Sequence, residues 1–406
     1  MPLDIDINKT ALDKVELVKP AVLRLAFRPL FLVGTIFSIV AMSWWIHYWS
    51  APFVWEPYGG TIWWHGHEML FGFGVAVVTG FLLTAVKTWT GVPGIKGMLL
   101  GGFVLVWILG RGLVSIGGSF PQTITALVDV SYLLFAAVAM AYPVIKVKQW
   151  RNLMFVPILL MLACFNALSH WSVISNQPIV ATQSLHATIM LFVLIIAILG
   201  GRVIPTFTEN ATGKTKLPAT LLLEVFAISS IVAMIVIAFI GFSIIDNNVL
   251  LVTATIAAIS NGLRFLRWGF QHTWSTPILW SLHLSFLFIP FGFVMLAFYA
   301  AGFMDNISAA LHSFTVGAIG GMILAMISRV TLGHTGRKMK PHRLVTVAFV
   351  SMATAAIIRV ILPVWLMDFY SVSIAISGVL WILSFSIYLY IYTPMLLTTR
   401  ADGRSG

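Results

Sequence analysis

The sequence predicts an all-α polytopic membrane protein with twelve transmembrane helices, for which three pseudo-symmetric four-helix units are one arrangement. Of its 406 residues, 59% are hydrophobic and only 9% are charged, whereas an average soluble domain is about 25% charged. The mean hydropathy is +0.98, and the apolar runs approach the ~20 residues that a membrane-spanning helix needs. These observations exclude a water-soluble globular protein and predict a single integral membrane domain over residues 1–406.

Twelve apolar runs follow one another with short connections that are too small to fold alone. They cover residues 30–49, 65–86, 97–116, 123–143, 153–172, 183–204, 218–242, 248–266, 276–301, 308–329, 344–366 and 370–397. We therefore expect residues 1–29 to form a cytoplasmic N-terminal segment and residues 398–406 to form a cytoplasmic tail.

The positions of the basic residues set the topology. With both termini in the cytoplasm, 22 of the 24 Lys and Arg residues fall on the inner side, and the outer loops contain none. This is the asymmetry of the positive-inside rule. It explains the formal charge of +11 without a nucleic-acid partner. The two exceptions are Arg111 and Arg359, which lie in the outer halves of the third and eleventh spans.

Histidines gather at the outer face, where His65, His67, His186 and His312 begin the second, sixth and tenth spans. The single cysteine excludes iron–sulfur clusters, thiolate zinc sites and C-x-x-C-H haem attachment within one chain. Imidazole ligands without a thiolate suit copper, haem iron or zinc. We interpret the other outer histidines, His47 and His170, as polar residues at helix ends.

A repeated pattern links the sixth and tenth spans. His186 opens the sixth span and Arg202 closes it, while His312 opens the tenth and Arg329 closes it. A Thr-Gly-basic loop follows both, and the second span, with His65, matches more loosely. The pattern predicts three corresponding four-helix units whose outer histidines converge, although short matches also arise by chance.

Helix geometry separates the two histidines of the second span. At 100° per residue, His65 and His67 project about 200° apart, so we expect them to serve different partners. His65 should share a face with Glu68 and Gly72. Glycines here, and at Gly317, Gly320 and Gly321 in the tenth span, would admit either a flat macrocycle or a neighbouring helix.

The two outer arginines have two interpretations. Haem propionates are anionic and favour arginine partners, so Arg111 and Arg359 are candidate propionate anchors. Alternatively, Arg111 forms a buried ion pair with Asp129, because an intramembrane charge must find a partner.

Two further sets of candidate residues lie near the inner side. Arg202, Arg329 and His334 predict a compact basic patch, which either binds an anion or a partner or anchors the helices in the membrane. His283 lies inside the membrane near the cytoplasmic side, where it could act as a metal ligand or proton carrier with Glu224 as its partner.

Four stretches together resemble the NnrS family across essentially the whole chain: residues 27–31 (FRPLF), 65–72 (HGHEMLFG), 200–205 (GGRVIP) and 332–337 (LGHTGR). The resemblance implies a multi-pass protein of the bacterial inner membrane that contains haem and copper. It also implies an association with denitrification and with resistance to nitric oxide.

A comparison with haem–copper oxidases and their nitric oxide reductase relatives is only partial. Those proteins also have twelve core helices with pseudo-threefold symmetry and place histidines on helices two, six, seven and ten. In this sequence the seventh span has no histidine, no His-His pair occurs, and the tenth span has one histidine. The oxidase metal centre therefore cannot be transferred directly.

We therefore expect a membrane protein that uses haem b and copper to bind nitric oxide and to contribute to its detoxification or reduction. His65, His67, His186, His283 and His312 are the candidate metal ligands, and Glu68 is the candidate catalytic acid or base. An enzyme of nitric oxide reductase type would need a quinol or another electron donor. The alternatives are a copper or haem transporter and a non-catalytic nitric oxide sensor or assembly factor.

Overall fold

The computed structural model describes residues 20–50, 55–117 and 119–404, and every regular element within them is helical. Twelve of the helical segments in this part are long and apolar enough to cross a membrane, which confirms the predicted fold class. The first and last segments, 1–29 and 398–406, were predicted to be cytoplasmic; positions 1–19 and 405–406 lie outside the described residues, and the cytoplasmic assignment stays a prediction.

The spans have the following bounds. The first six are α2 (Phe27–Ser50), α3 with η2 and α4 (Thr61–His67, Glu68–Gly74 and Val75–Thr90), α5 (Met98–Ile116), α6 (Gln122–Lys146), α7 with α8 (Trp150–Leu153 and Phe155–Ile174) and α9 (Pro178–Thr212). The last six are α10 (Leu221–Ile240), α11 (Asn247–Arg267), α12 (Pro277–Ala300), α13 with η4 and α14 (Ser308–His312, Ser313–Gly320 and Gly321–His334), α15 (Arg343–Trp365) and α16 (Tyr370–Leu397). Short 3₁₀ turns η1 (Ala21–Leu23), η3 (Phe270–His272) and η5 (Met367–Phe369) flank them.

Local sequence sets several of the helix ends. Gly91 and Gly213 follow α4 and α9 in the left-handed conformation, with φ of 71° and 67°, which a residue without Cβ adopts readily. The side chain of Asp246 accepts hydrogen bonds from the amides of Asn248 and Val249 and so caps α11. These ends keep the connections short and the helices antiparallel.

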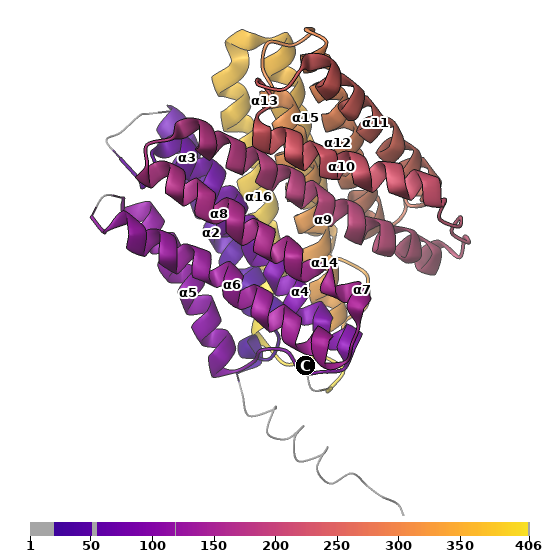
Figure 1. The fold of residues 1–406 in the computed structure, drawn as a ribbon. Coiled ribbons are helices and arrows are strands. Elements are labelled where there is room, and N and C mark those ends of the chain that lie inside the picture. The colour runs from indigo at the N-terminus through magenta and orange to yellow at the C-terminus, as the bar shows by residue number, and fades with distance from the viewer. Residues whose placement is uncertain (1–19, 51–54, 118, 405–406) are drawn as a thin grey trace, which may run out of the picture.

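The bundle closes as a ring of three four-helix units, formed by spans one to four, five to eight and nine to twelve. The last helix of each unit packs against the first helix of the next, so α6 lies on α8, α11 on α12, and α16 on α2 (Figure 1). Arg28 strengthens the closure by donating to the carbonyls of Leu396 and Thr398, at 2.9 and 2.7 Å. These contacts agree with three consecutive four-helix units, and the pseudo-symmetry between the units stays a prediction.

The second, sixth and tenth spans form the centre of the ring. The most apolar stretches of these three spans are 78%, 72% and 72% buried within the protein, against 39–67% for the other spans. Between them lies an apolar gap of about 70 Å³, lined by residues such as Val78, Ile195 and Ile323. Because each central helix carries one of the repeated histidines, this packing brings residues distant in sequence around one axis.

The two ends of the bundle differ in chemistry. At one end, which we call the basic end, Gly97 N donates to Leu23 O at 2.8 Å and Arg400 Nη1 donates to His334 O at 3.1 Å. The opposite end carries His65, His186 and His312, and we call it the histidine end. An even number of spans places both the start of α2 and the tail after α16 at the basic end.

Candidate cofactor cavity and buried polar cluster

Two of the three central spans change helix type directly after their histidines. The second span turns from α to π at Glu68, after His67, and the tenth does so at Ser313, after His312. Such π segments are rare and occur frequently at functional sites. Because they alter the angular step between residues, side chains after the change do not follow the 100° spacing of a regular helix.

The histidine end of the bundle contains a cavity of about 300 Å³ between the three central helices, which we call the outer cavity. His65, His186 and His312 all line it, together with Arg359. Its remaining walls are mostly apolar and aromatic: Met42, Trp45, Ile62, Met69, Leu70, Phe73, Leu185, Ile189, Leu311, Val316, Ile319, Ile374 and Trp381. The structure thus brings together the three repeated histidines, as the sequence pattern predicted, in a cavity whose size falls in the range of small-molecule sites.

The cavity histidines are held in defined orientations. His312 Nδ1 donates to the carbonyl of Ser308 at 2.7 Å, so the neutral ring presents Nε2 as its free lone pair. The ring of His65 stacks on Trp45 at 4.0 Å, with an interplanar angle of 11°. His65 Nδ1 is buried without a hydrogen-bond partner among the described residues. An imidazole left in this state in an apolar wall has unused capacity to bind a ligand.

Arg359 adds a positive charge to the same cavity. Its Nη2 reaches two hydroxyl oxygens, Ser308 Oγ at 3.4 Å and Tyr370 Oη at 3.3 Å. Its Nη1 is buried without a partner, and no described carboxylate lies within ion-pair distance of it. A guanidinium buried without a counter-ion favours an anionic group beside it.

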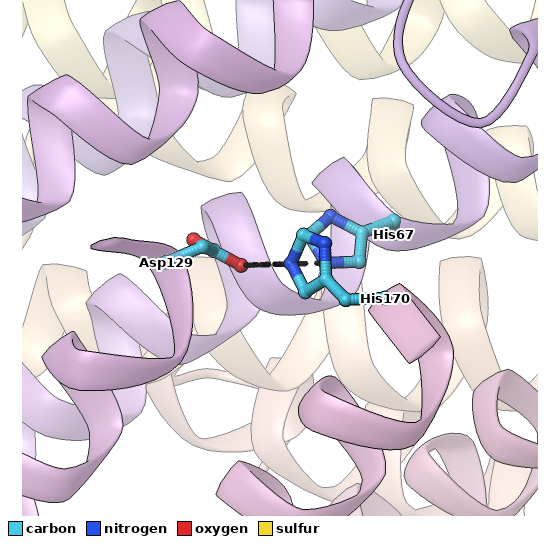
Figure 2. A group of neighbouring side chains, drawn as sticks. All are labelled: His67, Asp129 and His170. Atoms are coloured by element: carbon cyan, nitrogen blue, oxygen red, sulfur yellow. Dashed lines mark hydrogen bonds and ion pairs between the residues drawn. The ribbon is translucent and has the colours of Figure 1, made fainter. Parts of the chain in front are cut away.

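On the other side of the second span lies a compact group of polar side chains, which we call the buried cluster. It consists of His67, Glu68, Arg111, Asp129, Asn166 and His170, drawn from the second, third, fourth and fifth spans. All are at most 5% exposed. The carboxylate of Asp129 points at two imidazoles, 3.1 Å from His170 Nε2 and 3.4 Å from His67 Nε2 (Figure 2).

Arg111 holds the two carboxylates of the buried cluster. Its Nη1 donates to Glu68 Oε1 at 2.6 Å, and its Nη2 forms an ion pair with Asp129 Oδ1. The interpretation of Arg111 as a buried partner of Asp129 is therefore the one that the structure supports. Arg111 does not line the outer cavity, so the two arginines at this end have different surroundings.

Glu68 lies on the side of His67 and not, as predicted, on the face of His65. Its Oε1 accepts from His67 Nδ1 at 2.9 Å, and it is not among the residues that line the outer cavity. The prediction was wrong because His67 and Arg111 bind this carboxylate and hold it in the buried cluster. The expected separation of His65 from His67 is correct, since the first lines the cavity and the second lies in the cluster.

The glycines serve helix packing and not a flat ligand. A Cβ atom at Gly320 or Gly317 would collide with the ring of Trp381 or Phe288, and one at Gly321 would lie 2.6 Å from Ser285 Oγ. None of the three lines the outer cavity. Gly72 is likewise covered, by Phe37 and Arg111. Small residues at these positions allow close approach of neighbouring helices.

His283 lies apart from both sites. Its Nε2 is 2.9 Å from Thr208 Oγ1, and it does not line the outer cavity. Its predicted partner Glu224 instead binds Arg264, with Oε2 at 2.9 Å from Nη2. That prediction was wrong because Arg264, on the adjacent helix α11, supplies the counter-ion that this carboxylate needs.

The three residues of the basic patch predicted at the inner side contact different neighbours. Arg202 donates to Met154 Sδ at 3.2 Å, whereas Arg329 lies 3.6 Å from the centre of the Phe207 ring. The ring of His334 packs against Phe27 at 5.6 Å. Each of the three side chains therefore has its own neighbours, and a joint anion site stays a prediction.

The sequence interpretation missed part of the buried cluster. His170 was taken for a polar helix end, yet it is 1% exposed and its Nδ1 lies 3.1 Å from Tyr58 Oη. Asn166 also belongs to the cluster, since its Nδ2 donates to Asp129 Oδ2 at 2.9 Å. The available signal was their spacing, because polar residues four apart share one helix face.

The fold and these two sites define an integral membrane protein whose central helices carry a histidine-lined cavity beside a buried histidine–carboxylate cluster. The NnrS protein family profile matches residues 21–400. The chain therefore belongs to the NnrS family, which gives it a role in the response to nitric oxide and an association with metal or haem binding. No curated protein matches the chain.

Proposed function

We propose that this protein binds haem b in the outer cavity and binds nitric oxide at that haem, and so contributes to nitric oxide detoxification during denitrification and nitrosative stress. One observation carries the proposal: three histidines from three central helices and an arginine without a counter-ion line one cavity. Imidazole supplies an axial ligand for haem iron, and a guanidinium is a strong partner for a propionate.

The donor set fits haem better than a bare metal ion. In the described part of the chain, one group of His, Cys, Asp and Glu brings three ligand atoms within 4.8 Å of one another, and it is His67, Asp129 and His170. The histidines of the outer cavity are more widely separated, so they do not grip a single ion as they stand. Such spacing leaves room for a macrocycle between them, with apolar walls against its faces.

The residues of this site would act by binding and by excluding water. His312, oriented by the Ser308 carbonyl, would be the best prepared residue to hold the haem iron, and His65 and His186 are the other candidates. Arg359 would hold a propionate. Bound there, haem supplies an iron position at which nitric oxide binds. The apolar walls suit this ligand, because nitric oxide partitions into lipid and needs no aqueous channel.

Binding is favoured over turnover by the cavity itself. Reduction of nitric oxide to nitrous oxide consumes protons and electrons, the latter from a quinol or another donor. None of the described residues that line the cavity is a carboxylic acid. Glu68, the candidate catalytic residue, is bound by Arg111 and His67 on the other side of the helix. We therefore propose a nitric oxide binder first and a reductase second.

Purified protein from haem-replete cells tests the proposal. We expect a stoichiometric Soret band that shifts with nitric oxide under anaerobic conditions. Substitution His312→Ala should lower the haem content about tenfold or more through loss of the oriented ligand, whereas exposed His272→Ala should leave it unchanged. Haem retained in full by His65→Ala, His186→Ala and His312→Ala would contradict the site. Absence of haem from the wild type would favour a transporter of copper or haem.

Nitrous oxide measurement separates the two activities. Anaerobic incubation with nitric oxide and a quinol should give a spectral shift without nitrous oxide if the protein is a binder. Steady production of nitrous oxide that depends on the quinol would show a reductase, and it would require a proton donor other than the described cavity residues.

A further inference from the structure

We infer that the buried cluster is a second, separate metal site, in which His67, His170 and Asp129 bind one copper(II) or zinc ion. The atoms that would bind it are His67 Nε2, His170 Nε2 and Asp129 Oδ2. The three residues come from the second, fifth and fourth spans, and each offers a ligand atom within 4.8 Å of those of the other two. Two imidazoles and a carboxylate are a donor set that late first-row divalent ions favour.

The spacing of these atoms fits a bound ion. Asp129 Oδ2 lies 3.1 Å from His170 Nε2 and 3.4 Å from His67 Nε2. Ligands that bind one ion at about 2.0–2.2 Å stand roughly 3 to 3.5 Å apart in tetrahedral or square arrangements. Asn166 Oδ1 is 2.8 Å from His67 Nε2 and could complete a fourth position. An ion therefore needs little rearrangement of these side chains.

Each of the two imidazoles has a hydrogen bond at Nδ1, and this bond orients its Nε2 atom toward the proposed metal position. His67 Nδ1 donates to Glu68 Oε1 at 2.9 Å, and Arg111 holds that carboxylate in turn. His170 Nδ1 bonds to Tyr58 Oη at 3.1 Å. Metal-binding histidines characteristically bond their second nitrogen in this way, which fixes the ring and its tautomer. Glu68 is thus a positioning residue in this site.

Charge also favours a cation here. With neutral histidines, the cluster contains the carboxylates of Glu68 and Asp129 and the single guanidinium of Arg111. One negative charge remains in excess among side chains that are at most 5% exposed. A buried charge in excess is costly, and a bound divalent ion supplies the missing positive charge.

Packing around the cluster gives it a dry and rigid boundary. The indole of Trp63 stacks on His67 at 4.3 Å with an interplanar angle of 18°, and its Nε1 donates to Ser169 Oγ at 2.9 Å. Asp129 belongs to the first four-helix unit and His170 to the second. A metal ion would therefore link two units at the histidine end, back to back with the outer cavity.

Metal titration of the full-length protein in detergent tests this inference. Metal-depleted protein is loaded with Cu²⁺, Zn²⁺ or Co²⁺ alone, dialysed and analysed for metal per chain. We expect one tightly held ion, with Cu²⁺ and Zn²⁺ arms deciding which is preferred. Electron paramagnetic resonance of the copper form should show coupling to two imidazole nitrogens. A wild-type protein that retains none of the three ions would overturn the inference and indicate that a proton on His67 balances the charge.

Matched variants locate the ion. His67→Gln and His170→Gln should each weaken metal binding by at least about tenfold, and exposed His272→Gln should not. Asp129→Asn keeps the shape of the side chain and removes its charge, so it should also release the ion. Unchanged metal content in all three cluster variants would overturn the assignment. If a variant does not fold, the nitrogen coupling in the wild type still decides.

Haem content, measured in the same samples, separates this inference from the proposed function. Loss of the metal with normal haem and a normal nitric oxide shift supports two independent sites. Retention of the cluster metal in a His312→Ala protein that has lost its haem supports the same conclusion. If His67→Gln and His170→Gln remove haem and leave the metal unaffected, the metal assignment is wrong.

Discussion

With neutral histidines, the two sides of the second span hold opposite uncompensated charges. On one side, the outer cavity has about 300 Å³ of space and a positive charge on Arg359 that no described carboxylate balances. On the other, the buried cluster has two carboxylates and one guanidinium among side chains that are at most 5% exposed. His65 and His67, two residues apart, belong to different sites.

This difference shows what each site is suited to bind. A spacious apolar cavity with one unpaired cation suits a large ligand that carries anionic groups, as haem does. A tight cluster with one negative charge in excess suits a small cation. The identity of the ligand therefore depends on the sign of the unpaired charge and on the free space around the histidines. The imidazoles themselves can bind either haem iron or a single metal ion.

The largest effect should come from removing the arginine of the buried cluster. Arg111→Ala leaves the carboxylates of Glu68 and Asp129 buried without their counter-ion, and loss of one partner of a buried ion pair costs about 3–5 kcal/mol. Thermal unfolding in detergent, followed by tryptophan fluorescence, should show a large drop in midpoint. Metal-free protein is the cleaner sample, since a bound ion would offset part of the loss.

A smaller effect, on a different property, should follow from the corresponding change in the outer cavity. Arg359→Gln should speed haem loss to a scavenging protein about tenfold, as expected for loss of a charged hydrogen bond to a propionate. In haem-free protein the same change should not lower the unfolding midpoint, because it removes an unpaired buried charge. Tyr370→Phe, which keeps the charge, is the control. Equal destabilisation by Arg111→Ala and Arg359→Gln would break the comparison.

The smallest effect should come from an exposed ion pair at the basic end. Arg400 Nε lies 2.9 Å from Asp402 Oδ1 and holds the pKa of Asp402 at about 2, below the usual 3.8. A lowered pKa in the folded state means that this pair contributes fully above about pH 3.8 and is lost as the pH falls through 2. Because the pair is exposed, its contribution to stability should be slight.

Hydrogen exchange measures this change directly. The amide of Ala401 donates to Thr335 O at 2.9 Å, and its protection should fall between pH 4 and pH 2 as Asp402 becomes protonated. Asp402→Asn should reduce this protection already at pH 5, whereas the exposed Asp305→Asn should have no effect. A tail whose protection is the same at both pH values would show that the pair does not hold it.

Sequence reasoning succeeded where a property depends on a run of residues or on one helix. The spans follow from hydropathy, and the opposite placement of His65 and His67 follows from helix geometry. It failed where two helices compete for one group. Glu224 binds Arg264 and not His283, and nothing in the local sequence reveals which neighbour reaches a carboxylate first.

The sequence by itself determined the twelve spans, the repeated histidine pattern and the family, because each is written in the order and periodicity of residues along the chain. Only the tertiary structure decided that Glu68 joins His67, that His170 and Asn166 complete the buried cluster, and that Arg359 has no acidic partner in the described part of the chain. The reason is physical: the environment of a buried polar group depends on the helices packed around it and on local changes such as the π segment at Glu68.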